Sequence, residues 1–415
     1  MNKVNNIAFF FILYFSLLTG FYFDENLNFG SYYDWINVYV PPIKDFSENF
    51  GETLLNYDQY GQRHSPIFII LLSFLFKIGI SFDVIRIINL HLSLSLIFIF
   101  YNSLKIIFKN IDKSKLQLLS LVIFLSPTFR SLSIWPDSRL PGLIFFVLSI
   151  YFFIKLLKNE KIKNAWLCSI SLLLSAYISP NFSLFAFYFY PIFFFKIKTF
   201  EFLKIVFLNF ILSLPMFYYL FYLDVNFLVA GNTPGYIDGE STNVNFNISN
   251  KILIISSIIL FHLIPIIINY LSFQKILKFY KKNFVIILSI LIVLVVFFDY
   301  RLNFTGGGVF FQFSQLFFGN NYIFYFICFF AISMIYLVSK KSIYNFYLFV
   351  IIVASNVQNT IYHKYYEPLI LILFFLLVKN IDTEKFFKNN INFIYLYLLS
   401  IIYISMRLYK IYFIV

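Results

Sequence analysis

The chain has 415 residues, of which 60% are hydrophobic, 23% aromatic and only 12% charged. A soluble fold of this length has too little interior to bury so much Phe, Ile and Leu, and the same composition excludes a disordered chain. The net charge of +13 comes from lysines scattered in short clusters between apolar runs. Because no basic domain gathers them, we expect no nucleic-acid partner. The composition therefore predicts an all-α polytopic membrane protein.

The apolar runs predict about thirteen transmembrane helices, within a range of 11–14. The first run, Ile7–Leu18, follows Lys3 and precedes no small-x-small cleavage site, which favours a retained helix over a signal peptide. The runs at 165–179, 182–196 and 365–378 are short enough to be half-helices. The other predicted spans are 84–108, 116–133, 139–157, 202–223, 251–271, 283–299, 319–338, 342–361 and 391–409.

Residues 1–415 are expected to form one transmembrane domain without a separate soluble domain. Its longest polar parts are the first outer loop, 24–83, and the second outer loop, 224–250. Within the first loop, Ile67–Ile80 is too short to span and contains Lys77, so it predicts a re-entrant or interfacial helix. Counting it as a span would place basic loops alternately on both sides, and we reject that alternative.

With the N-terminus inside, the inner loops collect most of the 32 basic residues but few of the 19 acids. This positive-inside pattern orients the protein in its membrane. We expect an integral protein of a bacterial inner (plasma) membrane, whose site faces the periplasm or exterior. An endoplasmic reticulum membrane fits the same pattern.

Acids and a few cations gather at the predicted outer boundary, in the stretches 24–25, 63–66, 135–139, 299–301 and 363–368. Such a set suits a reaction between a hydroxyl and a lipid phosphate, since acids accept the proton and cations hold the phosphate charge. Each stretch also has a structural interpretation. The Asp24-Glu25 pair could be a solvated loop start, and Asp137 could cap the helix that begins near Arg139.

Three other features are less informative. His91 and His262 lie within apolar runs, where a neutral histidine bonded between helices is the favoured interpretation. The run Gly306-Gly307-Gly308 is expected to be a flexible outer loop, because it lacks the context of a phosphate-binding loop.

Taken in order, these stretches resemble the GT-C superfamily of multi-span glycosyltransferases that use polyprenyl-phosphate sugars. The similarity is to the protein O-mannosyltransferase and aminoarabinose-transferase branch, and it covers about the first 160 residues. The C-terminal half is similar only in the rhythm of its spans. The matching stretches are Asp24-Glu25, Arg63-His64-Ser65-Pro66 with the helix Ile67–Gly79, Arg86, and Trp135-Pro136-Asp137.

The resemblance implies transfer of a monosaccharide from a polyprenyl-phosphate donor to an acceptor hydroxyl on the outer side, with inversion. Asp24 would be the base with Glu25 second, and Asp137 would orient the acceptor or support the base. Because the family's large C-terminal domain is missing and the loop 224–250 is short, the acceptor could be a glycan, a lipid or a protein. Candidates for the donor phosphate are Arg63, His64, Arg301, His363, Lys364 and Tyr366, the last three on local sequence alone.

Two further questions stay open from sequence. Carboxylates are ligands for Mg²⁺ or Mn²⁺, so either ion is a candidate cofactor, although no spaced Asp-x-Asp motif supports one. The alternative function is a transporter, flippase or polymerase of lipid-linked glycans. A transporter should carry polar residues near the bilayer midplane on broken helices.

Overall fold

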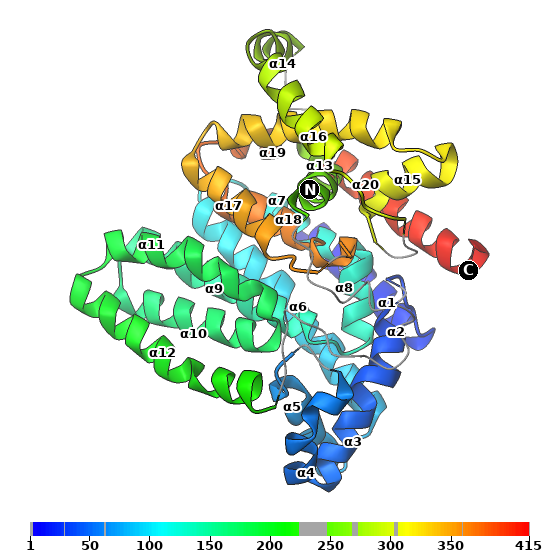
Figure 1. Cartoon of the computed structure of the whole chain (residues 1–415), viewed down its shortest axis with the longest axis vertical. Coiled ribbons are helices and arrows are strands. Elements are labelled where there is room, and N and C mark those ends of the chain that lie inside the picture. Colours follow the sequence, from blue (N-terminus) through cyan, green and yellow to red (C-terminus); the bar gives the residue numbers. More distant parts are fainter. Residues whose placement is uncertain are drawn as a thin grey trace. The chain divides into compact units, whose positions relative to one another are not determined.

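The computed structural model describes residues 3–28, 30–61, 64–223, 247–267, 273–302, 306–358 and 360–414. Across these ranges the chain is helical and forms no regular strand (Figure 1). Two compact units are present. Unit 1 comprises Met1–Asn243 with Ile401–Val415, and unit 2 comprises Val244–Ser400.

Seven helices are long and apolar enough to cross a membrane, or eight if one bent pair forms a single span. The protein is therefore a helical membrane protein, as its composition predicts. The count of thirteen stays a prediction, because several predicted spans correspond to shorter helices. The seven are α6 (Phe82–Ile107), α9 (Arg139–Asn159), α12 (Thr199–Phe221), α13 (Ile248–Ile267), α14 (Phe273–Val296), α16 (Tyr322–Ser339) and α20 (Ile391–Tyr409).

The first outer loop contains more helix than the sequence indicates. The predicted interfacial helix is α5, Ile67–Lys77, whose 11 residues rise about 16 Å and so cannot cross a hydrocarbon core about 30 Å thick. It buries Phe68, Ile69 and Leu72 and packs against α3. The additional short elements are α2 (Gly30–Asp34), η1 (Trp35–Tyr39), α3 (Val40–Glu48), α4 (Phe50–Leu55) and η2 (Tyr57–Tyr60).

The predicted span 116–133 is broken in the middle. Helix α7 (Lys113–Leu121) runs into the 3₁₀ turn η3 (Val122–Leu125), and α8 (Pro127–Ile134) restarts at an angle of 67°. The sequence explains the break, because the Ser126 hydroxyl accepts the Phe129 amide at 3.0 Å and Pro127 occupies the first helical turn. The bend sets the direction of α8, which carries Arg130.

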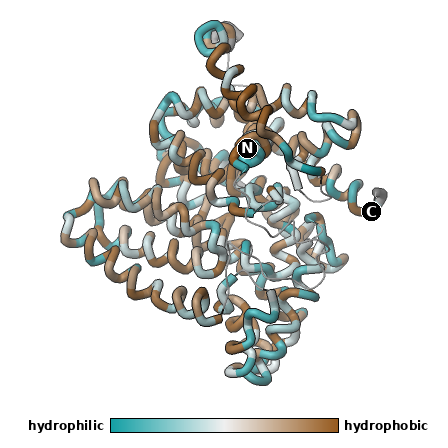
Figure 2. Tube along the Cα trace, in the orientation of Figure 1, coloured by the Kyte–Doolittle hydropathy of each residue, from teal (hydrophilic) through white to brown (hydrophobic). Residues whose placement is uncertain are grey.

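Four helices of unit 1 run side by side: α9, α10 (Ile162–Ile178), α11 (Ala186–Lys196) and α12 (Figure 1). The short turn η4 (Pro180–Phe185) links α10 to α11. Figure 2 shows that these helices are mostly hydrophobic along their length, whereas α3 and α4 are more hydrophilic. Helix α1 (Lys3–Tyr22) contacts α7 and α8 of the same unit.

In unit 2 the predicted glycine loop is the start of a helix. Gly307 donates its amide to the Ile361 carbonyl at 3.0 Å, and α15 (Gly308–Phe318) follows. Gly307 and Gly308 have positive φ angles of 88° and 75°, which glycine adopts without strain. A Cβ on Gly308 would lie 2.8 Å from Ile258 of α13, so glycine also permits close packing here.

Helix α13 has fourteen buried residues and contacts the other long elements of unit 2. Two of its neighbours are much shorter than the predicted spans 342–361 and 365–378. Helix α17 (Ile343–Ala354) rises about 18 Å and α18 (Leu369–Leu377) about 13 Å. Between them, the described residues 355–358 and 360–368 form no α-helix. The remaining short elements of unit 2 are η6 (His363–Tyr365) and α19 (Glu384–Lys388).

Asn345 joins the first turn of α17 to the end of α18. Its amide donates to the carbonyls of Val338 at 3.0 Å and Lys379 at 2.9 Å, and its carbonyl accepts the Lys379 amide at 2.8 Å. The side chain is 4% exposed, so these bonds are shielded from solvent. The two short helices are therefore joined as a pair at Asn345 and Lys379.

We expect Asn345→Ala to lower the free energy of unfolding by about 2 kcal/mol, because three hydrogen bonds to the backbone of Val338 and Lys379 are lost. Thermal unfolding of the purified protein measures the effect. The control is Asn37→Ala, whose exposed side chain bonds only to Tyr33 one turn earlier. Equal melting temperatures for the two variants would show that Asn345 does not hold the pair.

Candidate functional site

Asp24 sits where α1 ends. The Glu25 amide donates to the Gly20 carbonyl at 2.8 Å, which is the six-to-one hydrogen bond of a Schellman end. Asp24 occupies the left-handed position of this turn with φ 52°, a conformation that Asp and Asn tolerate better than most residues. The turn points the carboxyl group away from the helix, and 62% of the side chain is exposed.

Arg86 of α6 holds one oxygen of Asp24, with Nη2 2.5 Å from Oδ1. The guanidinium is fixed from other directions as well. Its carbon lies 3.7 Å from the ring centroid of Trp135, and its Nε donates to the Ile134 carbonyl at 3.3 Å. The other oxygen of Asp24, Oδ2, has no partner among the described residues. Asp24 is thus oriented by a rigid cation while one oxygen stays available.

Glu25 has a different environment from its neighbour. Arg130 of α8 binds both of its carboxylate oxygens, with Nε–Oε1 at 2.6 Å and Nη2–Oε2 at 2.7 Å. The side chains are 5% and 14% exposed for Arg130 and Glu25, respectively. Arg130 also donates to the Ser16 carbonyl at 2.9 Å, and Gly20 leaves the space that the pair needs. A carboxylate bound at both oxygens is suited to holding α1 against α8 rather than to accepting a proton.

Asp137 is almost fully buried, with 1% of the residue exposed. Its Oδ1 accepts the Arg139 amide at 2.9 Å, but the N-cap of α9 is Ser138, so the predicted capping role of Asp137 is wrong by one residue. The Arg139 guanidinium lies 3.4 Å from Asp137 and 3.5 Å from Asp34 of α2. Arg139 therefore links the start of α9 to Asp34 of the first outer loop, and no described contact joins Asp137 directly to Asp24.

Tyr39 completes this part of unit 1. Its hydroxyl donates to Ser138 Oγ and accepts the Ser138 amide, both at 3.0 Å. Burial raises the pKa of Tyr39 well above its usual value, and the negative charge of Asp137 raises that pKa further. The phenol therefore stays protonated and acts as a hydrogen-bond donor.

The predicted phosphate ligands fall in different parts of the chain. Arg63 lies outside the described residues. His64 is in unit 1, where its carbonyl accepts the Tyr57 hydroxyl at 3.2 Å. The other four belong to unit 2: Arg301, His363, Lys364 and Tyr366. Within unit 2, Lys364 lies 5.2 Å from the ring centroid of Tyr362, whereas Tyr366 is 2% exposed.

Unit 2 has a polar centre of its own around His363. The Nε2 atoms of His262 and His363 are 2.9 Å apart, so one nitrogen donates a hydrogen bond to the other. His262 therefore bonds to another element, as the sequence indicates, and so does His91, whose Nε2 lies 2.9 Å from the Tyr14 hydroxyl. Tyr300 fixes the same segment by accepting the Ile361 amide at 3.1 Å, and burial raises the pKa of Tyr300 to about 12.

Within the described ranges, no group of three or more His, Cys, Asp or Glu side chains is placed to hold a metal ion. The carboxylates near α1 pair with arginines instead. Magnesium or manganese therefore stays a prediction for which these residues offer no ligand set.

Sequence reasoning missed Arg130 and the partner of His262. Arg130 could have been recognised, because an arginine inside an apolar run predicts a buried acidic partner. The contact between His262 and His363 had no such signal, since the two residues are 101 positions apart.

No family model matches this sequence, and neither the curated proteins nor the solved structures show a match. The functional interpretation therefore depends on the geometry of the residues around Asp24 and His363.

Proposed function

We propose that this protein is a membrane glycosyltransferase of the GT-C type, which moves one sugar from a polyprenyl-phosphate donor to an acceptor hydroxyl. The observation that carries the proposal is the contrast between two adjacent carboxylates. Asp24 is exposed and keeps one oxygen without a partner, whereas Arg130 occupies both oxygens of Glu25. Neighbouring acids in unlike environments are typical of catalytic sites in which one acid takes part in the reaction and the other stabilises the structure.

In this mechanism the acceptor oxygen attacks the anomeric carbon while the bond to the donor phosphate breaks. Asp24 Oδ2 takes the proton of the attacking hydroxyl, and the phosphate leaves with the electron pair of the broken bond, so the configuration inverts. Arg86 keeps the Asp24 carboxylate oriented during this step. Phosphate is a good leaving group, so the reaction needs one base and no obligatory acid.

The proposal places the site on the outer face of the membrane, as the charge pattern predicts, with a glycan, a lipid or a protein as acceptor. The direct test reconstitutes the purified chain in liposomes with a radiolabelled polyprenyl-phosphate sugar and follows label into acceptor fractions. Deleting the gene and analysing cellular glycans identifies the sugar and acceptor. Unchanged glycans and lipid-linked sugars in the deletion strain would contradict the proposal.

A second candidate function, transport of lipid-linked sugars, has its own support in unit 2. Helices α17 and α18 are half the length of a span, and the segment between them places His363 against His262 of α13. Short helices around a polar centre are a feature of transporters.

The two functions predict different results for His262→Leu. A transporter should move a fluorescent polyprenyl-phosphate sugar across a liposome membrane, lose most of that movement in His262→Leu, and keep it in Asp24→Asn. A transferase should show the opposite sensitivity, with sugar transfer lost in Asp24→Asn. Loss of the same activity in both variants would contradict both assignments.

A further inference from the structure

A cavity of about 200 Å³ lies between α10, η4, α11 and α12 of unit 1. It is too large for a single water molecule. None of the proposed catalytic acids lines it. Every one of the four elements contributes at least one uncharged polar side chain: Ser169, Ser183, Tyr190, Asn209, Ser213 and Tyr219.

Two of these polar side chains, Tyr219 and Asn209, keep an atom without a partner among the described residues. Ser169 is 1% exposed, and its hydroxyl lies beside that of Tyr190. The Tyr219 hydroxyl bonds to none of the described residues, although the residue is 7% exposed. Asn209 donates its side-chain amide to the Ile205 carbonyl at 2.8 Å, and its Oδ1 has no partner among the described residues. Unpaired polar groups in an apolar surrounding cost free energy, and a hydrogen-bonding ligand removes that cost.

The lining restricts the chemistry of such a ligand. Among the described residues no charged side chain lines the cavity, so these residues offer a phosphate or carboxylate no compensating charge. Hydroxyl and amide groups beside tyrosine rings instead suit a neutral molecule with hydroxyls on its edge and an apolar face. A sugar ring has both properties, and few precisely placed polar groups among aromatic side chains are typical of ligand pockets.

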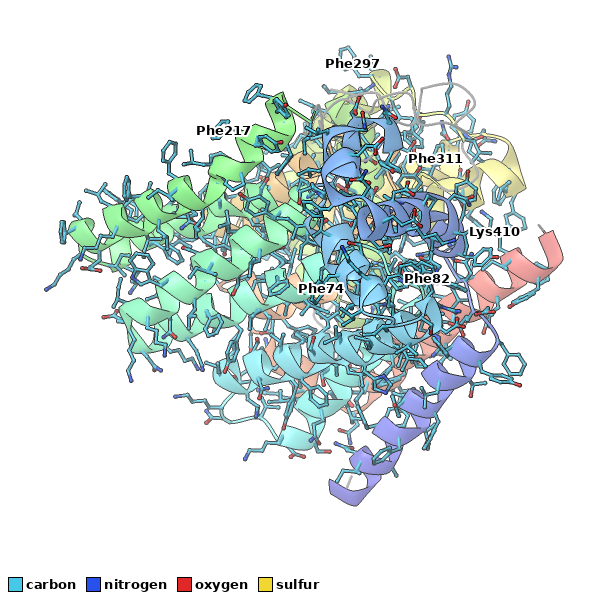
Figure 3. The ribbon with its side chains drawn as sticks, turned by 90° about the horizontal axis from the view of Figure 1, so that it is seen from below. Phe74, Phe82, Phe217, Phe297, Phe311 and Lys410 are labelled. Carbon is cyan, nitrogen blue, oxygen red and sulfur yellow. The ribbon has the colours of Figure 1, made fainter. Side chains whose placement is uncertain are left out.

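The surroundings favour a sugar that is attached to a lipid. Ile205 and Tyr219 are the buried residues of α12, and beyond its first turn the exposed residues of that helix are mostly large and apolar. Figure 3 shows aromatic side chains, including Phe217, projecting outward from it. A hydrocarbon chain can lie along this surface while its sugar enters between the helices. Ser65 also bonds to the carbonyl of Tyr177, another lining residue, at 2.7 Å, so the loop with His64 lies beside the cavity.

We infer that this cavity binds the sugar of a lipid-linked saccharide, with hydrogen bonds from Ser169, Asn209 and Tyr219. That the saccharide is linked to a lipid rests on the proposed function. The inference adds a saccharide-binding site that is separate from Asp24.

The experiment measures binding without turnover. The full chain carrying Asp24→Asn is placed in phosphatidylcholine nanodiscs, and the Kd of tritiated citronellyl-phosphate mannose is determined. Adding Tyr219→Phe should weaken binding about tenfold, since one hydrogen bond to the sugar is lost. Tyr218→Phe is the matched control, because Tyr218 is the adjacent residue on α12 and is 45% exposed. It should leave the Kd unchanged.

Citronellyl phosphate without sugar is the second probe, and Tyr219→Phe should not alter its binding. Equal weakening of both probes, or displacement of both by phosphatidylglycerol, would assign the cavity to a lipid chain or headgroup and overturn the inference. An unchanged Kd for the mannose probe in Tyr219→Phe would overturn it as well. Sugar transfer that fails while this binding pattern holds would contradict the proposed function alone.

Discussion

The Asp24→Asn variant should lose sugar transfer by a factor on the order of 10²–10⁴, the usual contribution of a general base, while it inserts and folds normally. An amide cannot accept the proton from the attacking hydroxyl. It does preserve the rest of the local structure, because Asn also tolerates the left-handed backbone and can still accept the Arg86 hydrogen bond. The measurement is the initial rate of transfer from a radiolabelled polyprenyl-phosphate sugar in liposomes.

Asp83→Asn is the matched control for this variant. Asp83 also lies near Arg86, at 3.4 Å, but its side chain is 82% exposed and it starts α6 rather than ending α1. We expect its transfer rate to stay within a factor of about two of the wild-type rate, as for an exposed ion pair of little energetic weight. Full activity in Asp24→Asn, or equal loss in Asp83→Asn, would remove Asp24 from the role of base.

The second large effect concerns stability. Either Glu25→Leu or Arg130→Met should lower the free energy of unfolding by about 3–5 kcal/mol, because each leaves a buried charge without its partner. The double variant should be more stable than either single variant, since two apolar side chains of similar size carry no unpaired charge. Thermal unfolding of the four proteins in one detergent gives this double-mutant cycle.

An exposed ion pair in the same protein should contribute much less to the free energy of unfolding. Lys204 and Glu201 of α12 are 2.9 Å apart, but their side chains are 47% and 31% exposed. Glu201→Gln should therefore change stability by less than about 1 kcal/mol. If Glu25→Leu had an equally small effect, the bidentate contact with Arg130 would not be the link between α1 and α8.

The sequence predicts the helical class well because lipid imposes a strong constraint on composition and run length. It also predicts a short helix within 67–80, and the structure has one at Ile67–Lys77; its re-entrant or interfacial placement stays a prediction. It does not predict α15, the early end of α17 or the late start of α18. These boundaries lie beside close packing at Gly308, the bond from Ile361 to Tyr300 and the contact of His363 with His262, which are tertiary contacts without a local pattern.

The candidate site shows the same division. Scarcity of charge makes Asp24, Glu25 and Asp137 conspicuous in the sequence. The separate environments of Asp24 and Glu25 could not be predicted, because they depend on arginines from α6 and α8 that are far along the chain. Arg86, for example, is 62 positions from Asp24. Residue type indicates which groups can react, whereas partner identity decides which of them is free to do so.

The contact between Glu25 and Arg130 also bears on how the protein is made. The two residues are 105 positions apart, so at a synthesis rate of 5–20 residues per second α1 leaves the ribosome about 5–20 s before its partner exists. Arg130 in turn arrives on a short helix whose insertion an unpaired guanidinium would oppose. Stable insertion of that segment therefore depends on α1 being retained nearby, and the earliest helix serves as the assembly template for a later one.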